Sequence, residues 1–360
     1  MYEICVSMSK LQNPLRGRGA SDNPINRFEG NYVDYELDKE TGEKPSPKTQ
    51  LFADDTKQVI SWNKSPDIPF EAGLNPYRGC EHGCIYCYAR PYHEYLGFSA
   101  GIDFESKIVV KYNAPELLRK QFISPKWKPQ VVVMSGVTDC YQPIERKLEI
   151  TRNCLKVFAE FRNPVGIITK NHLVTRDIDY LKELSDQKCV SVTISVTSLD
   201  NKLTEIMEPR TSRAKRRLEA IEKLAKANIP VRVNVAPIIP GLTDHELPSI
   251  LQSAYDAGAT QASYIIVRLP YKVKDLFCDW LEQHYPDRKD KVENRLLDMR
   301  GGKLYNSEWG NRMKGEGVFS KQIKDVFDVQ IKRLGMNLAH HPLTTDNFIK
   351  KSGDQLQLFT

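Results

Sequence analysis

Three cysteines lie within eight residues of this sequence, and their spacing suits a metal–sulfur cluster. They are Cys80, Cys84 and Cys87, in the pattern C-x-x-x-C-x-x-C. Three thiolates on one short loop can each reach a different iron of a cubane, which leaves the fourth iron without a protein ligand. An open iron can bind a substrate or cofactor, whereas a fully ligated electron-transfer cluster cannot. The spacing therefore predicts a four-iron four-sulfur (4Fe-4S) cluster that takes part in chemistry.

A zinc site is the alternative for the same residues, with His82 or a distant side chain as the fourth ligand. Structural zinc usually takes two C-x-x-C knuckles, and no second knuckle follows in the chain. His82 lies between the ligands on a short loop, where its ring can hardly turn toward the same ion. The spacing favours the cluster, and a non-catalytic zinc-containing nucleic-acid-binding protein stays as the alternative from another class.

The other cysteines and the bulk composition describe an ordinary intracellular chain. Five cysteines stand singly, at positions 5, 140, 154, 189 and 278, so we expect buried thiols, no disulfide framework and no second cluster. No run of eighteen apolar residues exists, and the N-terminus lacks the pattern of a secretory signal. We therefore expect a cytoplasmic protein without a membrane partner. The net charge of +6 permits an anionic partner but does not require one.

From residue 72 to residue 274, short apolar runs alternate with longer amphipathic stretches. Strands are predicted over 106–112, 130–137, 165–169, 190–196, 230–236 and 263–269, and helices over 146–161, 176–185, 214–227 and 244–257. Apolar strands separated by helices predict an α/β fold with a parallel sheet. Six such units favour a partial (β/α)6 barrel, whose ligands bind at the carboxyl ends of the strands. A doubly wound open sheet is the second choice, because its glycine fingerprint is missing.

The chain divides into four parts by composition. Residues 1–68 are polar and rich in turn formers, which predicts an irregular, extended N-terminal arm. Residues 69–274 form the barrel with the cysteine loop. Residues 275–351 read as a helical C-terminal extension with a glycine-rich basic loop over 300–317, and residues 352–360 as a flexible tail.

The pattern C-x-x-x-C-x-aromatic-C on a loop after the first strand of a β/α barrel resembles the radical S-adenosylmethionine (SAM) superfamily. The resemblance covers about residues 72–274. It implies that the open iron chelates the amino and carboxylate groups of SAM. It also implies that reduction cleaves the sulfonium to methionine and a 5′-deoxyadenosyl radical, which abstracts a substrate hydrogen. A reductant such as flavodoxin or ferredoxin would supply the electron. Tyr86, before the third cysteine, would pack near the adenine, or serve as a core aromatic residue.

Within the superfamily, three segments are similar to the spore photoproduct lyase and DNA repair photolyase-like subgroup. They are Thr138-Asp139, Thr169-Lys170 and the region of Ser195, each at the carboxyl end of a predicted strand. The resemblance implies that these residues hold SAM: Asp139 accepts from the methionine amino group, Lys170 pairs with the carboxylate, and Ser195 faces the ribose. The alternatives are helix capping for Asp139 and a surface salt bridge for Lys170.

One departure from the subgroup concerns the spore photoproduct reaction itself. Spore photoproduct lyases carry a cysteine at the position of Val137, where it donates a hydrogen to the product radical. Cys140 follows three positions later and is either a substitute donor or a plain buried thiol. Tyr141 is a further candidate radical relay. Both residues are candidate catalytic groups.

Three features indicate a nucleic-acid partner. The run from Arg210 to Arg217 carries five basic residues after a predicted strand, and the loop over 300–317 mixes basic and aromatic residues among glycines. Each also suits a solvated face or a capping loop. The tail Gln355-Leu356-Gln357-Leu358-Phe359 resembles the bacterial sliding-clamp-binding motif, with docking of the tail on its own domain as the alternative. We expect radical SAM chemistry on a nucleic acid base, with modification of a protein or small metabolite as the second possibility.

Overall fold

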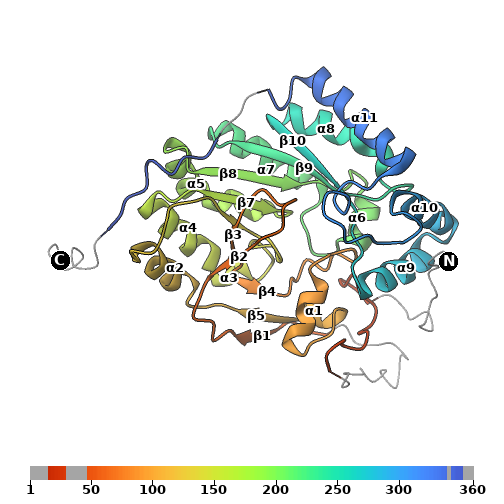
Figure 1. Cartoon of the computed structure of the whole chain (residues 1–360), viewed down its shortest axis with the longest axis horizontal. Coiled ribbons are helices and arrows are strands. Elements are labelled where there is room, and N and C mark those ends of the chain that lie inside the picture. Colours follow the sequence, from red (N-terminus) through yellow and green to blue (C-terminus); the bar gives the residue numbers. More distant parts are fainter. Residues whose placement is uncertain (1–14, 30–46, 339–341, 352–360) are drawn as a thin grey trace.

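A parallel sheet forms the centre of the computed structural model, which describes residues 15–29, 47–338 and 342–351. The strands follow the order β10-β9-β8-β7-β6-β3-β2, and all neighbours are parallel except β2 and β3 (Figure 1). Their bounds are β2 Ile60–Trp62, β3 Ala72–Leu74, β6 Val132–Met134, β7 Val165–Thr169, β8 Val190–Ser195, β9 Val231–Ile238 and β10 Gln261–Ile266. Consecutive neighbours in a six-stranded parallel order confirm the expected partial (β/α)6 architecture. Among the described residues β3 and β10 do not pair, so the curved sheet stays open.

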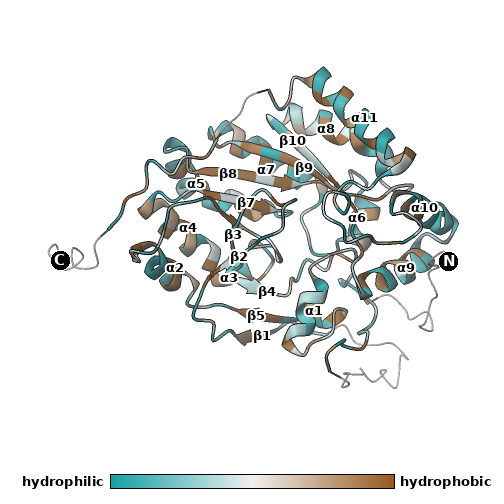
Figure 2. Cartoon of the chain, in the orientation of Figure 1, coloured by the Kyte–Doolittle hydropathy of each residue, from teal (hydrophilic) through white to brown (hydrophobic). Residues whose placement is uncertain are grey.

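Helices cover the outer face of this sheet, and their spacing of apolar residues explains why. They are α2 Ala114–Ile123, α4 Ile150–Phe161, α5 Ile178–Asp186, α7 Ala214–Lys226, α8 Leu247–Asp256 and α11 Gly317–Leu334. In α4, for example, Ile150, Cys154, Phe158 and Phe161 recur every three or four residues and are buried. Figure 2 shows the brown apolar strands of the sheet beside helices that are teal on their outer sides. The buried faces form one main hydrophobic core.

One predicted strand lies in a different sheet. Residues 106–112 contain strand β5 Lys107–Val110, which pairs with β1 Gln50–Ala53 and β4 Tyr77–Arg78 in a separate three-stranded sheet. The first barrel strand is β3, which has only three residues, too few to show an apolar period. The other five predicted strands are β6 to β10, so the expectation was wrong only for the first unit of the barrel.

The remaining helices comprise several short connecting turns and the longer pair α9 and α10, which pack against each other. They are η1 Arg90–Leu96, α1 Ile102–Ser106, α3 Glu145–Leu148, η2 His172–Asp177, α6 Asn201–Met207, η3 Asp244–Glu246, α9 Lys272–His284 and α10 Pro286–Met299. The predicted helix over 146–161 is divided at Glu149, whose φ of 52° breaks the helix between α3 and α4. Within the described ranges, no helix is long and apolar enough to cross a membrane.

The described C-terminal residues 342–351 run along the edge opposite the cysteines. Phe348 packs against Phe122 and Phe161, and its neighbour Ile349 donates to the carbonyl of Phe161, just before β7 begins. Lys351 pairs with Glu160 at 2.9 Å. These contacts fasten the segment at the amino ends of the parallel strands.

Candidate functional site

The cysteine loop follows β3 and β4 and therefore lies at the carboxyl ends of the barrel strands. Cys80 and Cys84 are buried, and Cys87 is half-buried. The amide of Cys80 donates to the carbonyl of Phe104 at 2.9 Å, which ties the loop to α1. Burial raises the pKa of the Cys84 thiol, and burial together with Cys80 raises the pKa of Cys87 to about 11. Loss of these protons is the expected consequence of metal binding.

A fully buried ion pair fixes the shape of the loop. Arg90 and Glu105 lie 2.5 Å apart, and neither side chain is exposed. The guanidinium of Arg90 also donates to the carbonyl of Cys84 at 2.9 Å and to that of Gly101 at 2.9 Å. Because a buried charge needs several partners, this arginine locks the carbonyls around the ligands in one geometry. Sequence reasoning did not identify the pair, although an arginine three residues after the last cysteine is a usable signal.

The N-terminal residues 15–29 form a strap across the outside of the loop. The amides of Gly19 and Ala20 donate to the carboxylate of Glu105 at 3.0 and 2.9 Å. A Cβ atom at Gly19 would lie 1.8 Å from the carbonyl oxygen of Gly83, so only glycine allows this approach. Leu15 and Ala20 are buried in the same apolar cluster as Cys84, Ile85 and Tyr86. The strap thus forms part of the wall of the site.

A second buried group, the Glu208 network, lies beside the cysteine loop. Glu208 follows α6, is 1% exposed, and accepts from the hydroxyls of Tyr86 and Thr197. Its carboxylate also pairs with Lys170 at 3.2 Å and with the buried guanidinium of Arg217. The structure therefore brings the predicted residues Tyr86 and Lys170 together. It adds Glu208, Thr197 and Arg217, whose roles depend on tertiary contacts that the sequence pattern does not reveal.

Lys170 is the residue of this network with access to the site. It follows β7, its side chain is 15% exposed, and its ammonium donates to Thr197 and to the carbonyl of Ala236, both at 2.8 Å. The ammonium also lies 5.7 Å from the centre of the Tyr86 ring. Burial and the nearby Arg217 lower the pKa of Lys170 to about 7. Because the positive charges of Lys170 and Arg217 exceed the single negative charge of Glu208, the network can bind a further anion.

Thr138 and Asp139 connect the end of β6 to the cysteine loop and to β7. Thr138 donates to the carbonyl of Gly79 at 2.7 Å, directly before the first cysteine. Asp139 accepts from the hydroxyl of Thr169 and the amide of Lys170 at 2.7 and 2.8 Å. His82 lies 3.3 Å from the same carboxylate. Burial lowers the pKa of His82, but Asp139 and Cys80 outweigh it and raise that pKa to about 10. Binding of the SAM amino group by Asp139 stays a prediction.

The remaining predicted residues lie at the edge of the site or in the core. Ser195 ends β8 and is buried, and its carbonyl accepts from Arg217 at 3.1 Å. Cys140 and Tyr141 are fully buried in the main hydrophobic core, and Tyr141 donates to Asp177 at 3.1 Å. Val137 packs instead, as Cys87 does, against the small cluster of Cys80, Ala89 and Phe104. The position where spore photoproduct lyases carry a cysteine thus lies beside the metal-ligand candidates and holds an aliphatic side chain.

Of the single cysteines, Cys5 lies outside the described residues, and the other four match expectation with one exception. Cys140, Cys154 and Cys189 are free and buried. Cys278 is disulfide-bonded, so the expectation of a plain thiol is wrong there.

Several of the predicted nucleic-acid-binding charges form internal ion pairs. In the basic run, Arg217 is buried with Glu208, and Arg210 pairs with Glu81 of the cysteine loop at 3.1 Å. In the glycine-rich loop, Arg312 pairs with Asp67 at 2.5 Å. Arg300 is buried and donates to the carbonyl of Val267 at 3.0 Å. The tail over 355–359 lies outside the described residues.

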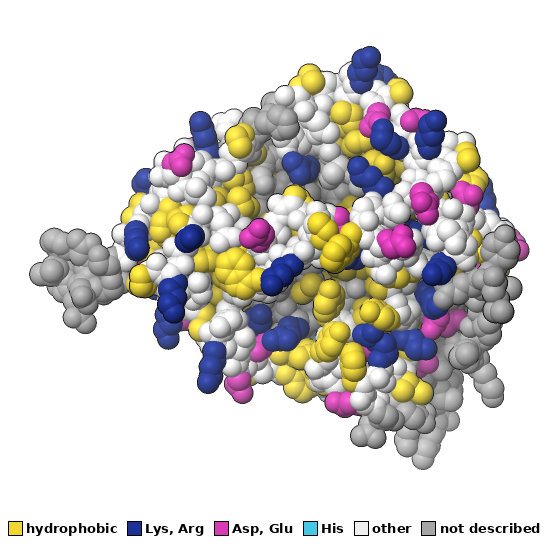
Figure 3. All heavy atoms as spheres, viewed as in Figure 1, with side chains coloured by type: hydrophobic (Ala, Val, Ile, Leu, Met, Phe, Trp, Pro, Cys, Tyr) yellow, Lys and Arg dark blue, Asp and Glu magenta, His cyan; other side chains and the backbone are white. Residues whose placement is uncertain are grey.

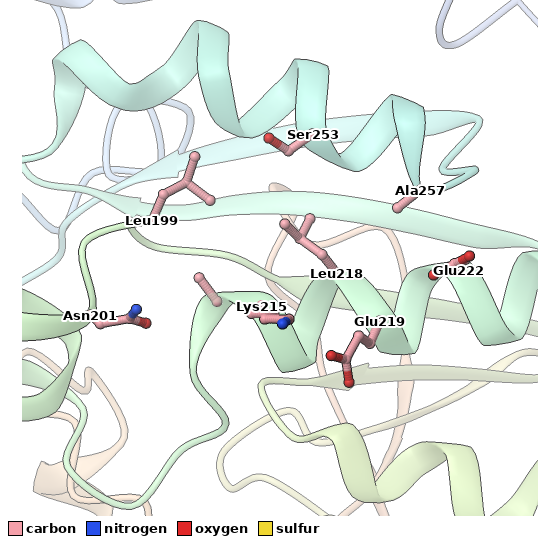
Figure 4. A pocket seen from close by; sticks show the side chains of 9 residues that line it. Leu199, Asn201, Lys215, Leu218, Glu219, Glu222, Ser253 and Ala257 are labelled. Atoms are coloured by element: carbon pink, nitrogen blue, oxygen red, sulfur yellow. The ribbon is translucent and has the colours of Figure 1, made fainter.

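A surface pocket lies away from the cysteines, between α7 and α8 (Figure 4). Its lining includes Leu199, Leu218 and Ser253, together with the charged residues Lys215 and Glu219. Because most of its lining residues belong to helices α7 and α8 on the outside of the sheet, we do not consider this pocket part of the candidate active site.

The side chains of the cysteine loop decide whether an iron–sulfur cluster fits this site. Within the residues that the structure describes, no group of three or more His, Cys, Asp and Glu side chains is close enough to hold a single metal ion. The cysteine loop offers three thiols from one short segment, with buried backbone anchors on both sides. Three thiolates of this kind are the ligands that iron–sulfur clusters take. The residues present therefore fit such a group.

Comparison with known proteins points to one family. The radical SAM superfamily model matches residues 74–254. An uncharacterized protein of Mycobacterium tuberculosis is 35% identical over 230 residues, which are 62% of this chain and 68% of that protein. An uncharacterized protein of Methanocaldococcus jannaschii is 30% identical over 279 residues, covering 77% of this chain and 98% of the relative.

Solved structures share the fold at low sequence identity. Spore photoproduct lyase complexed with a dinucleoside spore photoproduct has a TM-score of 0.55 and 16% identity, with 79% of each chain covered. A cysteine-to-serine mutant of spore photoproduct lyase has a TM-score of 0.56 and 17% identity over the same share of both chains. At this identity the likeness establishes the architecture of the chain.

Proposed function

The chain belongs to the radical SAM superfamily and is an enzyme of that class, and from this premise we propose that it carries out radical chemistry on a nucleic acid base. The observation that carries the proposal is the position of three cysteines beside the Glu208 network, at the carboxyl ends of a parallel partial barrel. Cys80, Cys84 and Cys87 would hold the 4Fe-4S cluster. When bound, such a cluster would supply the electron for reductive cleavage of SAM, which is the chemistry that would allow removal of a hydrogen from the substrate.

The side chains of the site would bind and orient SAM. The ammonium of Lys170 would pair with the SAM carboxylate, because the two cations of the Glu208 network exceed its one carboxylate. Glu208 would hold that ammonium in position and keep the Tyr86 ring fixed through its hydroxyl. Thr138 would hold the loop at Gly79, and Ser195 would border the ribose. Asp139, whose carboxylate already contacts Thr169, Lys170, His82 and the amide of Tyr141, would accept from the amino group through its remaining lone pairs.

The nucleic-acid substrate is supported by the shared architecture with spore photoproduct lyase and by basic and aromatic side chains around the mouth. The hydrophobic contact of Val137 with the cysteine cluster argues against the spore photoproduct reaction itself, because no thiol stands at that position. Repair or modification of another base lesion fits better. Modification of a protein or small metabolite is the second candidate, since several arginines of the basic run serve internal ion pairs.

Anoxic preparation tests the cluster. We expect a brown protein with about four iron atoms per chain, and a colourless one when Cys84→Ala removes a ligand. Cys154→Ala is the matched control, because Cys154 is buried in the core and should leave the iron content unchanged. A wild-type protein that is colourless and holds one zinc per chain would contradict the proposal.

Turnover with dithionite, SAM and deuterated oligonucleotides tests the substrate. Deuterium in 5′-deoxyadenosine would identify the base that loses a hydrogen. Cleavage of SAM without transfer of deuterium from any nucleic acid would favour the protein or small-metabolite alternative.

We further propose the bacterial sliding clamp as a partner through Gln355–Phe359. The preceding residues 342–351 are fastened at the amino ends of the strands, so a partner bound beyond them would leave the cysteine edge accessible. Phe359→Ala should abolish binding to a purified clamp, whereas Thr360→Ala should not. Equal binding of both variants and the wild type would refute the partner. A flavodoxin or ferredoxin as reductant stays a prediction.

A further inference from the structure

A belt of exposed aromatic side chains leads away from the cysteine loop. Its members are Tyr88, Tyr92, Tyr95, Phe28 and Tyr271, which are 38%, 55%, 68%, 56% and 61% exposed. Aromatic rings of this size rarely gather on a surface without a partner. Figure 3 shows hydrophobic side chains, tyrosines included, interleaved with Lys and Arg across the middle of the face it views.

The members of the belt are neighbours in space. Tyr88 directly follows the last cysteine, and Tyr92 and Tyr95 lie three residues apart on η1, where a 3₁₀ helix brings such positions onto one side. The ring of Tyr95 lies 4.8 Å from that of Phe28, with 30° between their planes. Phe28 belongs to the N-terminal strap, so chain segments more than sixty residues apart share the belt.

Arginines lie over the two ends of the belt. The guanidinium of Arg27 is 5.1 Å from the ring centre of Phe28 and 3.8 Å from that of Tyr271, and it also pairs with Glu94 at 2.6 Å. At the other end, Arg268 follows β10 and lies 4.8 Å over Tyr88.

Arg268 differs from Arg27 and Arg312 in its partners. Its guanidinium donates to the sulfur of Met313 at 3.5 Å, and its buried Nε has no hydrogen-bond partner in the part of the chain that the structure describes. No carboxylate among these residues pairs with it, whereas Arg27 and Arg312 pair with Glu94 and Asp67. A guanidinium with unused donors at the barrel mouth is suited to a phosphate.

We propose that the belt binds an unpaired strand of nucleic acid, with bases stacked on Tyr92 and Tyr95 and a phosphate on Arg268 beside the cysteine loop. This inference rests on the proposed function and refines it from nucleic acid in general to a single strand. Unpaired bases expose the flat faces that stack on aromatic rings, whereas a duplex presents them only at its ends. The belt would lead the strand to the loop, where Tyr88 marks the point nearest the cysteines.

Fluorescence anisotropy with a labelled fifteen-nucleotide single strand tests the belt, with a hairpin duplex of the same composition as the comparison probe. We expect tighter binding of the single strand, and about tenfold weaker binding for Tyr92→Ala and for Tyr95→Ala. Tyr255→Ala is the matched control, because Tyr255 is 45% exposed on α8, outside the belt. It should bind like the wild type.

Salt dependence tests Arg268. Arg268→Gln should lower the slope of log affinity against log salt by about one, as expected for one lost phosphate contact. Lys226→Gln removes an exposed charge at the C-terminal end of α7, at the opposite strand edge from the cysteines, and should leave the slope unchanged. SAM affinity of the reconstituted protein should be the same in all these variants, which excludes a collapsed site.

The outcomes separate this inference from the proposed function. If both tyrosine variants bind the single strand as tightly as the wild type does, the belt is not the binding surface, while the proposed function stands. If the duplex binds as tightly as the single strand, the preference for an unpaired strand is wrong. If no oligonucleotide binds even at low salt while SAM is still cleaved, both proposals fail, and the belt is better explained as a protein-binding surface.

Discussion

Two buried networks of acids, arginines and tyrosines occur in this molecule, and they differ in the balance of charge. The first is the Glu208 network beside the cysteines. The second, the Glu145 network, lies in the main core and consists of Glu145, Asp177, Arg152, Arg176, Tyr77 and Tyr141.

The Glu145 network is closed. Arg176 bridges Glu145 at 2.8 Å and Asp177 at 2.7 Å, and Arg152 adds a second contact to Asp177 at 2.9 Å. The tyrosine hydroxyls donate to the same two carboxylates. Two buried acids face the two arginines, and the exposed carboxylates of Asp179 and Glu149 add further contacts, so no positive charge is left over and we assign this network a structural role.

The Glu208 network is open. One carboxylate faces Lys170 and Arg217, and Lys170 keeps an exposed fraction of 15% toward the site. Its lowered pKa of about 7 has burial as the main cause and the excess of positive charge as the second. The comparison teaches that unmatched buried charge, rather than the number of polar residues, distinguishes a site that awaits an anion from one that holds the fold together.

Removal of a cation from the closed network should have the largest effect on stability. Arg176→Gln leaves two buried carboxylates short of a partner, so the free energy of unfolding should fall by about 3 to 5 kcal/mol. Denaturant unfolding of the anoxic apo-protein measures this. The affinity of the refolded, reconstituted variant for SAM should be unchanged, and a large loss of SAM affinity would mean that the two networks are coupled.

Removal of a cation from the open network should affect binding instead. Lys170→Gln leaves Glu208 with Arg217 and two hydroxyls, so the free energy of unfolding should change by less than about 1 kcal/mol. SAM should bind more weakly by about 2 kcal/mol, on the order of thirtyfold, because a charge-assisted contact with its carboxylate is lost. Calorimetric titration of the reconstituted protein measures it. Equal affinity would remove Lys170 from the cofactor site.

The smallest expected effect concerns pH. Because the pKa of Lys170 is lowered to about 7, its ammonium loses its proton as pH rises through that value, and the attraction for the SAM carboxylate falls. SAM affinity should therefore be nearly constant below pH 6.5 and decline by at most about tenfold per unit above pH 7.5. The Lys170→Gln variant should lack this decline. The same slope in wild type and variant would assign the pH dependence to another group.

Sequence reasoning went furthest where the signal was local. The cysteine spacing, the five strands from β6 to β10 and the helices between them all follow from patterns within a few residues of each other. Strand β3 was missed because three residues, Ala72 to Leu74, cannot display a period. Lys170 could be predicted as a site residue because it directly follows strand β7, whose carboxyl end faces the site.

The residues that sequence reasoning missed owe their roles to contacts across the fold. In the sequence Glu208 is an acid that follows a predicted helix-free stretch without any distinguishing pattern. Only in the fold do Tyr86, Lys170 and Arg217 surround it. Arg90 and Glu105 are fifteen residues apart and meet only when α1 packs on the cysteine loop. Their complete burial, which identifies them in the structure, leaves no trace in composition.

The close approach of Gly19 to Gly83 has a practical consequence for anyone who shortens this protein. The stretch that matches the family begins at residue 74, yet Leu15 and Ala20 cover Cys84, Ile85 and Tyr86. A version that starts at the first barrel strand would take the amide donors of Gly19 and Ala20 away from Glu105, leaving Arg90 as its partner, and would uncover the apolar cluster around Cys84. The stretch of sequence similarity is therefore shorter than the part of the chain that builds the wall of the site.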